Sequence, residues 1–229
     1  MTDWVLSLDL SSPQGILALE GHGKLFHREV AAGSRVSQLF VEADELLSLA
    51  GIDFKDIGAI GVAKGPGSFT GIRVAVMAAK TLAMVAHLPL VAPASLEVIA
   101  EGCRGPVEAV MVALDARRGE VYYGLYRLDS PIPATLEKPH VARPDLAAAS
   151  LIQWQDRLPG TIGLTGSGLK AYEDAWPAGM LIIEKAGPDA QGLSRLCRNY
   201  YRSGRVEEAL QLMPLYLRRP DLGGGATCA

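Results

Sequence analysis

Short blocks of apolar residues open the chain and predict a meander of three strands. The blocks are residues 4–10, 15–20 and 24–31. Gly21-His22-Gly23 separates the last two blocks, and such a step between two apolar segments is typical of a β-hairpin. The spacing then changes, because apolar side chains recur with a helical period from residue 39 to residue 50. We therefore expect a helix over 34–50, capped by Ser34 or Ser37.

The next part of the chain predicts strand, turn, helix and strand. An apolar run at 57–63 predicts a strand, and a glycine-rich turn then leads into a helix at 69–87, which Pro89 stops. A strand at 88–92 and a short helix at 95–101 follow. Residues 102–106 combine glycine, arginine and proline, and we expect a linker there.

Beyond the linker the same order of elements recurs in a less regular form. Strands are expected at 107–114, 121–128, 134–142, 161–165 and 180–183, and helices at 145–155, after the turn at 166–168, and at 189–202, with one or two further turns at 206–211. An extended piece at 214–218 and a glycine-rich tail at 223–225 complete the chain. We expect two α/β lobes, residues 1–102 and residues 103–229.

The turn at 65–73 reads Gly-Pro-Gly-Ser-Phe-Thr-Gly-Ile-Arg and joins a predicted strand to a predicted helix. Gly65 and Gly67 permit unusual backbone angles, and Ser68 can cap the helix. The turn lacks the Lys-Ser or Lys-Thr of a Walker loop, and its glycines do not follow the dinucleotide pattern. Two interpretations stay open: a phosphate-binding turn, or a tight turn that packs a helix closely onto a sheet, which the residues favour.

Two aspartates, Asp9 and Asp115, each end a predicted strand. No glycine follows Asp9 until Gly15, so the backbone is poorly suited to wrap a phosphate, and a turn-capping role is favoured. Asp115 is followed by two arginines and Glu120, a pattern that indicates a salt-bridged turn. The candidate residues of a nucleotide-like turn are Asp9, Gly65, Gly67, Ser68, Thr70, Gly71, Arg73 and Asp115.

The remaining chemistry-bearing residues predict no metal site, cofactor or catalytic residue. The four histidines, His22, His27, His87 and His140, form neither HxxxH nor HExxH. Gly166-Ser167-Gly168 lacks the spacing of a nucleophile elbow and predicts a turn.

Composition changes this picture only slightly. A chain of 229 residues with 49% hydrophobic and 21% charged residues fits a soluble α/β protein. The net charge of −3 gives no electrostatic footprint for nucleic acid. Three separated cysteines without a CxxC pair and an N-terminus without basic residues predict a reduced, cytoplasmic protein with no secretory signal. The apolar run at 74–86 contains Lys80, and we expect it to be too short to span a membrane.

The helix at 69–87 is apolar nearly all round, with Arg73 and Lys80 as its only charges before His87. A helix that covers one face of a sheet should show a polar outer face. Its alanines also keep it slim, so that another helix could approach closely. Burial within the chain and a protein–protein interface both fit this pattern. The candidate interface residues on this helix and on the helix at 34–50 are Leu39, Phe40, Ala43, Leu46, Val76, Ala79, Lys80 and Ala83.

Four segments resemble one known family. The turn at 65–73 closely resembles the hallmark of the TsaB (formerly YeaZ) family, and residues 6–12, 113–122 and 214–218 resemble its opening strand, its second signature and its C-terminal end. These segments lie in the family's order and span nearly the whole chain. One departure is Val36-Ser37-Gln38, where many members have a histidine before the polar pair. This chain therefore lacks the side chain that would supply the role of that histidine.

The resemblance implies an actin-like ATPase (ribonuclease H-like) fold of two lobes, which the predicted order of elements supports by analogy. It also implies a bacterial, non-catalytic partner in the formation of N6-threonylcarbamoyladenosine at position 37 of tRNA. Such a protein pairs through its first two helices with the catalytic paralogue TsaD or with a second copy, helps to recruit the small ATPase TsaE, and meets tRNA only indirectly. The alternatives are an independent small-molecule kinase or ATPase of this fold, disfavoured by the residues after Asp9, and a metallopeptidase, disfavoured by the lack of ligands.

Overall fold

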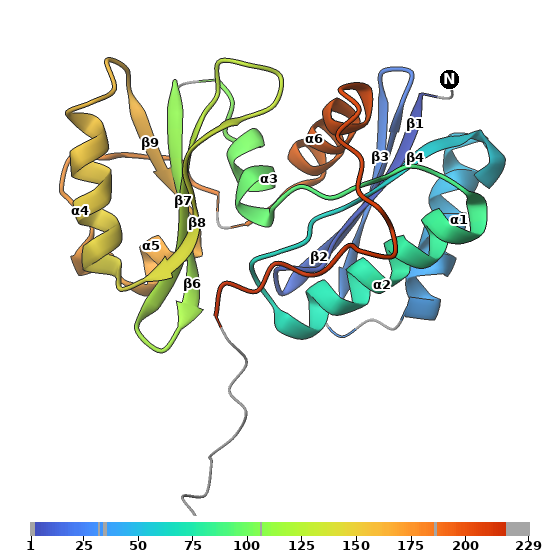
Figure 1. Cartoon of the computed structure of the whole chain (residues 1–229), viewed down its shortest axis with the longest axis horizontal. Helices are drawn as coiled ribbons and strands as arrows, with labels where there is room; N and C mark the ends of the chain where they lie inside the picture. The colour runs from blue at the N-terminus through green and yellow to red at the C-terminus, as the bar shows by residue number, and fades with distance from the viewer. Residues whose placement is uncertain (1–2, 32, 34–35, 106, 186, 219–229) are drawn as a thin grey trace, which may run out of the picture.

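The first lobe is built on a five-stranded mixed sheet. The structure, a computed structural model, describes residues 3–31, 33, 36–105, 107–185 and 187–218. The sheet has the order β3-β2-β1-β4-β5 (Figure 1). Its strands are β1 (Trp4–Asp9), β2 (Gln14–Gly21), β3 (Lys24–Ala31), β4 (Ile57–Val62) and β5 (Leu90–Val91). The first three strands form the predicted antiparallel meander, and β4 and β5 add to β1 in parallel.

The second lobe repeats this topology with the next set of strands. Its sheet has the order β10-β9-β6-β7-β8, again with an antiparallel meander at one side and two parallel strands at the other. The strands are β6 (Ala109–Arg117), β7 (Glu120–Arg127), β8 (Ala134–Ala142), β9 (Ile162–Thr165) and β10 (Leu181–Ile182). The expected second copy of the first arrangement is therefore confirmed.

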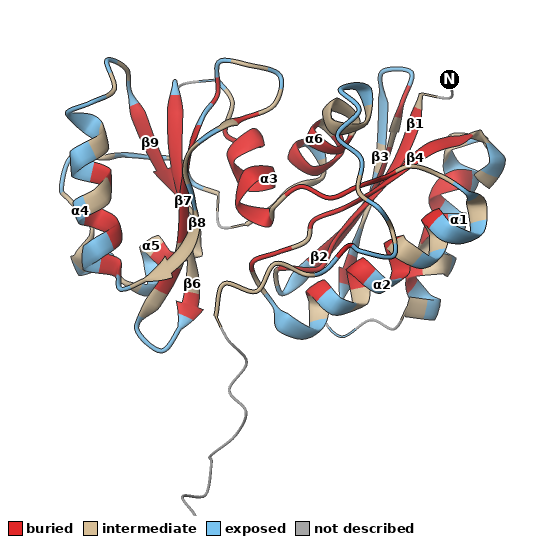
Figure 2. Ribbon diagram, in the orientation of Figure 1, coloured by how far each residue is buried: buried red, intermediate tan, exposed pale blue. Residues whose placement is uncertain are grey.

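Helices α1 (Val36–Ala50) and α2 (Phe69–Ala86) cover one face of the first sheet. Leu6 and Leu8 of β1 face them, and Leu39 and Leu46 of α1 complete a fully buried layer. Figure 2 shows β1 and β4 in the colour of buried residues. Helix α2 begins as the sequence predicts, because the Ser68 hydroxyl accepts the Gly71 N–H at 3.3 Å. In the second lobe, α4 (Pro144–Gln155), α5 (Ser167–Ala171) and the 3-10 turn η2 (Glu173–Ala175) lie on the outer side of the sheet. A further 3-10 turn, η1 (Phe54–Asp56), precedes β4.

Two helices are exchanged between the lobes. Helix α3 (Ser95–Glu101) follows the first sheet in the chain but packs its Leu96 and Ile99 against β6 and β7 of the second sheet. Helix α6 (Ala190–Arg202) follows the second sheet but packs its Leu193 and Leu196 against the first. The two helices lie side by side between the sheets (Figure 1). The boundary between residues 102 and 103 stays a prediction, and α6 beyond it belongs by packing to the first sheet.

The structure differs from the sequence-based expectation after α6. Residues 206–211, expected to add one or two helical turns, instead form a β-bridge from Glu207 to Leu90 and then one turn, in which the Glu208 carbonyl accepts from Gln211 and Leu212. The following residues run extended across α2 (Figure 1). The glycine-rich tail at 223–225 and the proposed cap Ser34 lie outside the described residues.

The helix expected at 69–87 is observed as α2, Phe69–Ala86, which is longer than the apolar run at 74–86 within it. Among the described residues, Phe69–Ala86 is the one helix that is long and apolar enough to cross a membrane, judged by length and composition alone. The core helix of a soluble protein passes the same test.

Candidate functional site

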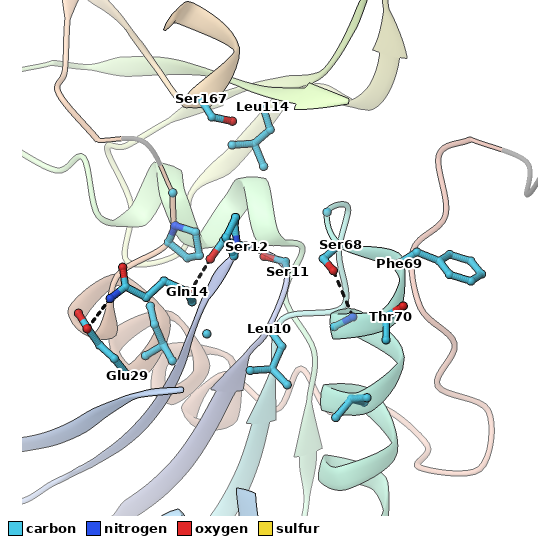
Figure 3. A pocket seen from close by; sticks show the side chains of 18 of the residues that line it. Leu10, Ser11, Ser12, Gln14, Glu29, Ser68, Phe69, Thr70, Leu114 and Ser167 are labelled. Atoms are coloured by element: carbon cyan, nitrogen blue, oxygen red, sulfur yellow. Dashed lines mark hydrogen bonds between the residues drawn. The ribbon is translucent and has the colours of Figure 1, made fainter. Parts of the chain in front are cut away.

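A cleft of about 1210 Å³ lies between the lobes, at the ends of the first strands of both sheets. Its walls are the turn after β1, the adjoining parts of β2 and β3, the start of α2, the turn after β6, the start of α5 and the residues before α6. Figure 3 shows Ser12 and Gln14 on one side, Ser68 and Thr70 on another, and Leu114 and Ser167 from the second lobe. Of the eight predicted nucleotide-like residues, the lining includes Gly67, Ser68, Thr70, Gly71 and Asp115. Asp9, Gly65 and Arg73 are not part of it.

Asp9 is sealed beneath the cleft. Its side chain is fully buried, and its Oδ1 accepts the backbone N–H of Ser11 at 2.7 Å. Among the described residues, its Oδ2 has no hydrogen-bond partner. Burial raises the pKa of this carboxyl from 3.8 to about 6, while the hydrogen bond from the Ser11 backbone lowers it. The geometry is that of an aspartate that caps its own turn, which is the role favoured from the sequence.

The glycines of the 65–73 turn let two backbones touch. A Cβ on Gly71 would overlap the carbonyl oxygen of Leu10, and a Cβ on Gly67 would overlap that of Ser11. The Ser68 N–H also donates to the Ser11 carbonyl at 2.7 Å. The start of α2 is therefore pressed onto the turn after β1. This contact fits the tight-turn interpretation, whereas phosphate binding by the turn stays a prediction.

The other predicted residues of this turn have different surroundings. Gly65 has a φ of 103°, in the region that favours glycine, and its carbonyl accepts the Ser95 N–H at 2.8 Å. Arg73 is exposed; its guanidinium lies 3.9 Å above the Phe69 ring and donates to the Tyr216 hydroxyl at 2.7 Å. Arg73 therefore fixes the C-terminal segment on α2, away from the cleft lining.

Asp115 is the counterpart of Asp9 in the second lobe, because β6 occupies the place of β1. Its Oδ1 accepts from the Arg117 N–H at 2.7 Å and from the Tyr172 hydroxyl at 3.0 Å. Its Oδ2 lies 3.2 Å from the Arg117 guanidinium, which confirms one pair of the expected salt-bridged turn. Gly166 repeats the glycine contact of the first lobe, since a Cβ there would overlap the Ala113 carbonyl oxygen. The cleft is thus lined by two related turns.

A C-terminal strap, residues 207–218, connects the region of the glycine-rich turn with the turn after β6. Its course was not predicted from the sequence. The Leu215 N–H donates to the Lys64 carbonyl at 2.7 Å. Lys80 of α2 donates to the carbonyls of Leu210 and Leu212 at 3.3 and 3.1 Å. Arg218 donates to the Ala116 carbonyl at 2.9 Å and pairs with Glu120. The strap therefore connects the first sheet, α2 and the turn after β6; its lone sequence signal is the extended piece at 214–218.

The predicted interface residues lie mostly inside the chain. The buried ones are Leu39, Ala43, Leu46, Val76, Ala79 and Ala83, whereas Phe40 and Lys80 are half-buried. Side chains that already pack in the core are not available to a partner in this conformation. The outward stripe of α2 is Met77, Thr81, Met84 and Val85, and α1 exposes Val41 and Leu49.

The described residues hold no group of three or more His, Cys, Asp and Glu side chains that could bind a metal ion. Cys103 and Cys197 are buried, and burial raises the pKa of their thiols to about 11 and about 12. Neither cysteine has the character of a nucleophile.

Comparison with known proteins identifies relatives over nearly the whole chain. A family model described as "TsaD: tRNA N6-adenosine threonylcarbamoyltransferase" matches residues 26–137. The tRNA threonylcarbamoyladenosine biosynthesis protein TsaB of Escherichia coli is 27% identical over 221 residues, which cover 93% of this chain and 94% of the relative. The corresponding protein of Bacillus subtilis is 48% identical over 73 residues, or 32% of either chain. The resemblance drawn from the motifs is confirmed.

Solved structures agree with this result. YeaZ from Pseudomonas aeruginosa superposes with a TM-score of 0.82 at 26% identity, covering 94% of this chain and 100% of that one. Component A of the (R)-2-hydroxyglutaryl-CoA dehydratase from Acidaminococcus fermentans gives a TM-score of 0.51 at 13% identity, over 89% of this chain and 99% of that one, and shows likeness of fold alone. The fold is the actin-like ATPase fold in two lobes, as expected.

Proposed function

Because this chain belongs to the TsaB (YeaZ) family, we propose that it is a non-catalytic partner in forming N6-threonylcarbamoyladenosine at position 37 of tRNA. The observation that carries the proposal is the match to the E. coli biosynthesis protein over 93% of the chain. In this role the chain binds and stabilises the catalytic paralogue TsaD, in the cytoplasm. It helps to recruit TsaE, forms a homodimer when alone, and meets tRNA only through its partners.

The packing at the cleft supports a non-catalytic role. The carboxylate that an actin-like ATPase would turn toward a metal–nucleotide is here the buried Asp9, whose hydrogen bond goes to its own turn. The backbones of Leu10 and Ser11, which would have to wrap a phosphate, are instead in contact with Gly67 and Gly71. This arrangement leaves the protein to act through binding, by holding its partner in an active conformation.

The surface best suited to TsaD is the outward stripe of α2 together with the exposed apolar residues of α1. Met77 is 57% exposed, Met84 46% and Val85 78%. Exposed apolar residues gathered on adjacent helices mark protein interaction sites. The strap adds Leu210 and Met213, both exposed, at the side of α2 where Lys80 holds it.

Changing Met84 to glutamate tests this surface. A buried charge at an interface is costly, so we expect Met84→Glu to weaken association with TsaD by at least about 30-fold, or about 2 kcal/mol. Because Met84 is exposed in the single chain, the unfolding free energy of the monomer should change by less than about 0.5 kcal/mol. Size-exclusion chromatography with light scattering, followed by titration of TsaD, measures both the association and its stoichiometry.

Leu146→Glu is the matched control, since Leu146 is 57% exposed on α4 of the other lobe. It should bind TsaD as the unaltered chain does. The proposal also requires that tRNA modification by TsaD depends on adding this protein. A chain that ignores TsaD and hydrolyses ATP alone would instead support the kinase or ATPase alternative.

A further inference from the structure

The exchanged helices α3 and α6 touch through glycine. A Cβ on Gly192 of α6 would lie 2.8 Å from the Val98 carbonyl oxygen and 3.0 Å from the Gly102 nitrogen. Glycine at this position therefore lets the backbones of the two helices lie in direct contact, with no side chain between them. Because α6 packs on the first sheet and α3 on the second, any change in the angle between the lobes must act at this contact.

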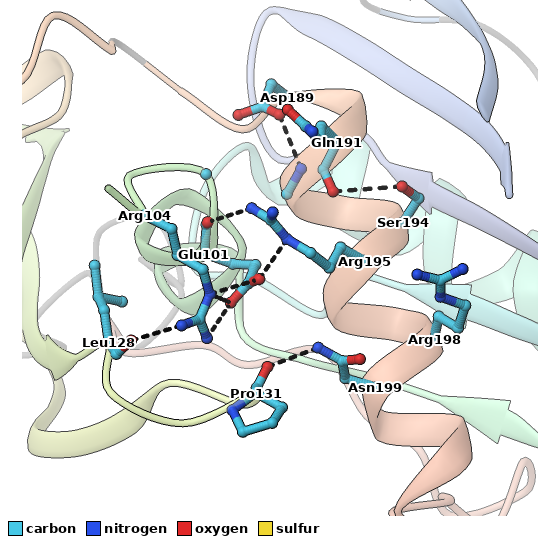
Figure 4. A network of polar contacts seen from close by, with 12 residues as sticks. Glu101, Arg104, Leu128, Pro131, Asp189, Gln191, Ser194, Arg195, Arg198 and Asn199 are labelled. Atoms are coloured by element: carbon cyan, nitrogen blue, oxygen red, sulfur yellow. Dashed lines mark hydrogen bonds and ion pairs between the residues drawn. The ribbon is translucent and has the colours of Figure 1, made fainter. Parts of the chain in front are cut away.

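A buried carboxylate lies at the same contact. Glu101, the last residue of α3, has no exposed side-chain surface. Its Oε1 is 2.6 Å from the Arg195 Nε of α6, and the Arg195 guanidinium also donates to the Glu101 carbonyl at 3.0 Å (Figure 4). Arg104 Nε donates to both carboxylate oxygens at 2.8 Å. Two arginines from different parts of the chain therefore neutralise one buried charge.

Arg104 extends this cluster into the second lobe. Its two terminal nitrogens donate to the carbonyls of Leu128 at 2.6 Å and Ser130 at 2.5 Å, in the loop after β7. Asn199 of α6 donates to the Pro131 carbonyl of the same loop at 2.6 Å. Tyr200 of α6 donates to both carboxylate oxygens of Glu97 on α3 at 2.8 Å. Helix α6 is thus bonded to the second lobe at three places along its length.

We infer that Glu101, with Arg104 and Arg195, is a lock that fixes the angle between the lobes. Rotation of one lobe on the other would pull Arg195 from Glu101 and leave a buried carboxylate without one of its partners, which is a costly state. The cleft therefore keeps one opening, instead of closing over a ligand as the lobes of a hinged enzyme do. The inference rests on the contact geometry and is independent of the proposed function.

The test measures the distance between the lobes in solution. Spin labels are placed on the complete chain at Lys24→Cys, in the β2–β3 hairpin, and at Gln153→Cys, on α4, both exposed. Cys228 is replaced by serine, and dilution with unlabelled protein suppresses distances between molecules. We expect one narrow distribution of label distances when Glu101 is present. The distribution for Glu101→Gln should be at least about twofold wider.

Glu101→Gln leaves the partly exposed guanidinium groups of Arg104 and Arg195 without their carboxylate, which weakens folding, so a second variant keeps the inference testable. Arg195→Lys retains the charge but loses the bond from α6 to the Glu101 carbonyl, and it should widen the distribution as well. Arg127→Lys is the control, because Arg127 pairs with Asp129 at the surface of the second lobe. The inference would be overturned if the unaltered chain gave a wide distribution of label distances. It would also be overturned if the variants folded and kept the narrow distribution.

Discussion

Gly71→Ala should lower the free energy of unfolding by about 3 kcal/mol or more, since overpacking against rigid backbone is among the costlier substitutions. The added Cβ would overlap the Leu10 carbonyl oxygen and lie 3.0 Å from the Leu10 carbonyl carbon. Both are backbone atoms, so no side chain can turn away to make room. Helix propensity alone predicts the opposite sign, because alanine stabilises a helix by about 1 kcal/mol relative to glycine. A loss of unfolding free energy would therefore indicate close packing, whereas a gain would indicate that helix propensity dominates.

Gly187→Ala is the control for this experiment. Gly187 lines the same cleft, but a Cβ there would meet only the Ser12 Cβ at 3.8 Å, which is ordinary contact. Chemical denaturation followed by circular dichroism should show a large loss for the first variant and a change below about 0.5 kcal/mol for the second. An unchanged or raised stability of Gly71→Ala would mean that α2 does not press on the turn after β1.

Asp9→Asn should alter the pH dependence of stability. The folded-state pKa of Asp9 is raised from 3.8 to about 6 by burial, so the folded chain binds this proton more tightly than the unfolded chain. Its contribution to stability is therefore full below the unfolded pKa and is lost as the pH rises through the folded pKa. Since each pKa unit corresponds to about 1.4 kcal/mol, the loss amounts to about 3 kcal/mol.

Asparagine carries no charge at any of these pH values, and its Oδ1 can still accept the Ser11 N–H. The difference in unfolding free energy, variant minus unaltered chain, should therefore rise by about 3 kcal/mol from about pH 3.5 to about pH 7.5. Comparing the same two proteins at each pH cancels the fixed cost of burying the amide. A difference that stays flat or falls over this range would show that Asp9 reaches solvent or a cation.

The elements of the first lobe were predictable because short-range signals set them. Gly21-His22-Gly23 marks the β2–β3 hairpin, in which His22 and Gly23 both have positive φ. Ser68 starts α2 and His87 ends it in a left-handed conformation before Pro89. Those signals act within a few residues, so a single sequence is enough to find them.

The orientation of α2 was not predictable, because a helix that is apolar all round gives no preferred face. The structure turns Val76, Ala79 and Ala83 inward, where alanine lets the helix lie close to the sheet, and turns Met77 and Met84 outward. The expected interface residues come from a helix that is apolar nearly all round and from its neighbour, and the structure packs most of them into the core. The helix pair stays a hypothesis for the partner surface, but six of the eight residues predicted for it are buried within the chain, and Phe40 and Lys80 are half-buried.

Contacts between residues far apart in the sequence also could not be predicted from the sequence alone. Asp9 and Asp115 could be recognised as strand ends, yet nothing local shows that the first is sealed and the second lines a cleft. Glu101 reads as a charge near a linker, and its partner Arg195 lies far along the sequence. The course of the strap depends on Lys80, which donates hydrogen bonds to the carbonyls of Leu210 and Leu212. The hydrophobic periodicity of the sequence does not predict these bonds.

The exchange of α3 and α6 bears on whether either half can stand alone. Each half contributes a sheet with the same strand order and then gives its last helix to the other half. A half separated at the linker would therefore leave one apolar face of its sheet uncovered, unless its own helix folded back onto that face or a second copy supplied one. Cutting the chain at this point exposes both faces at once, so each half depends on the other for the burial of its sheet.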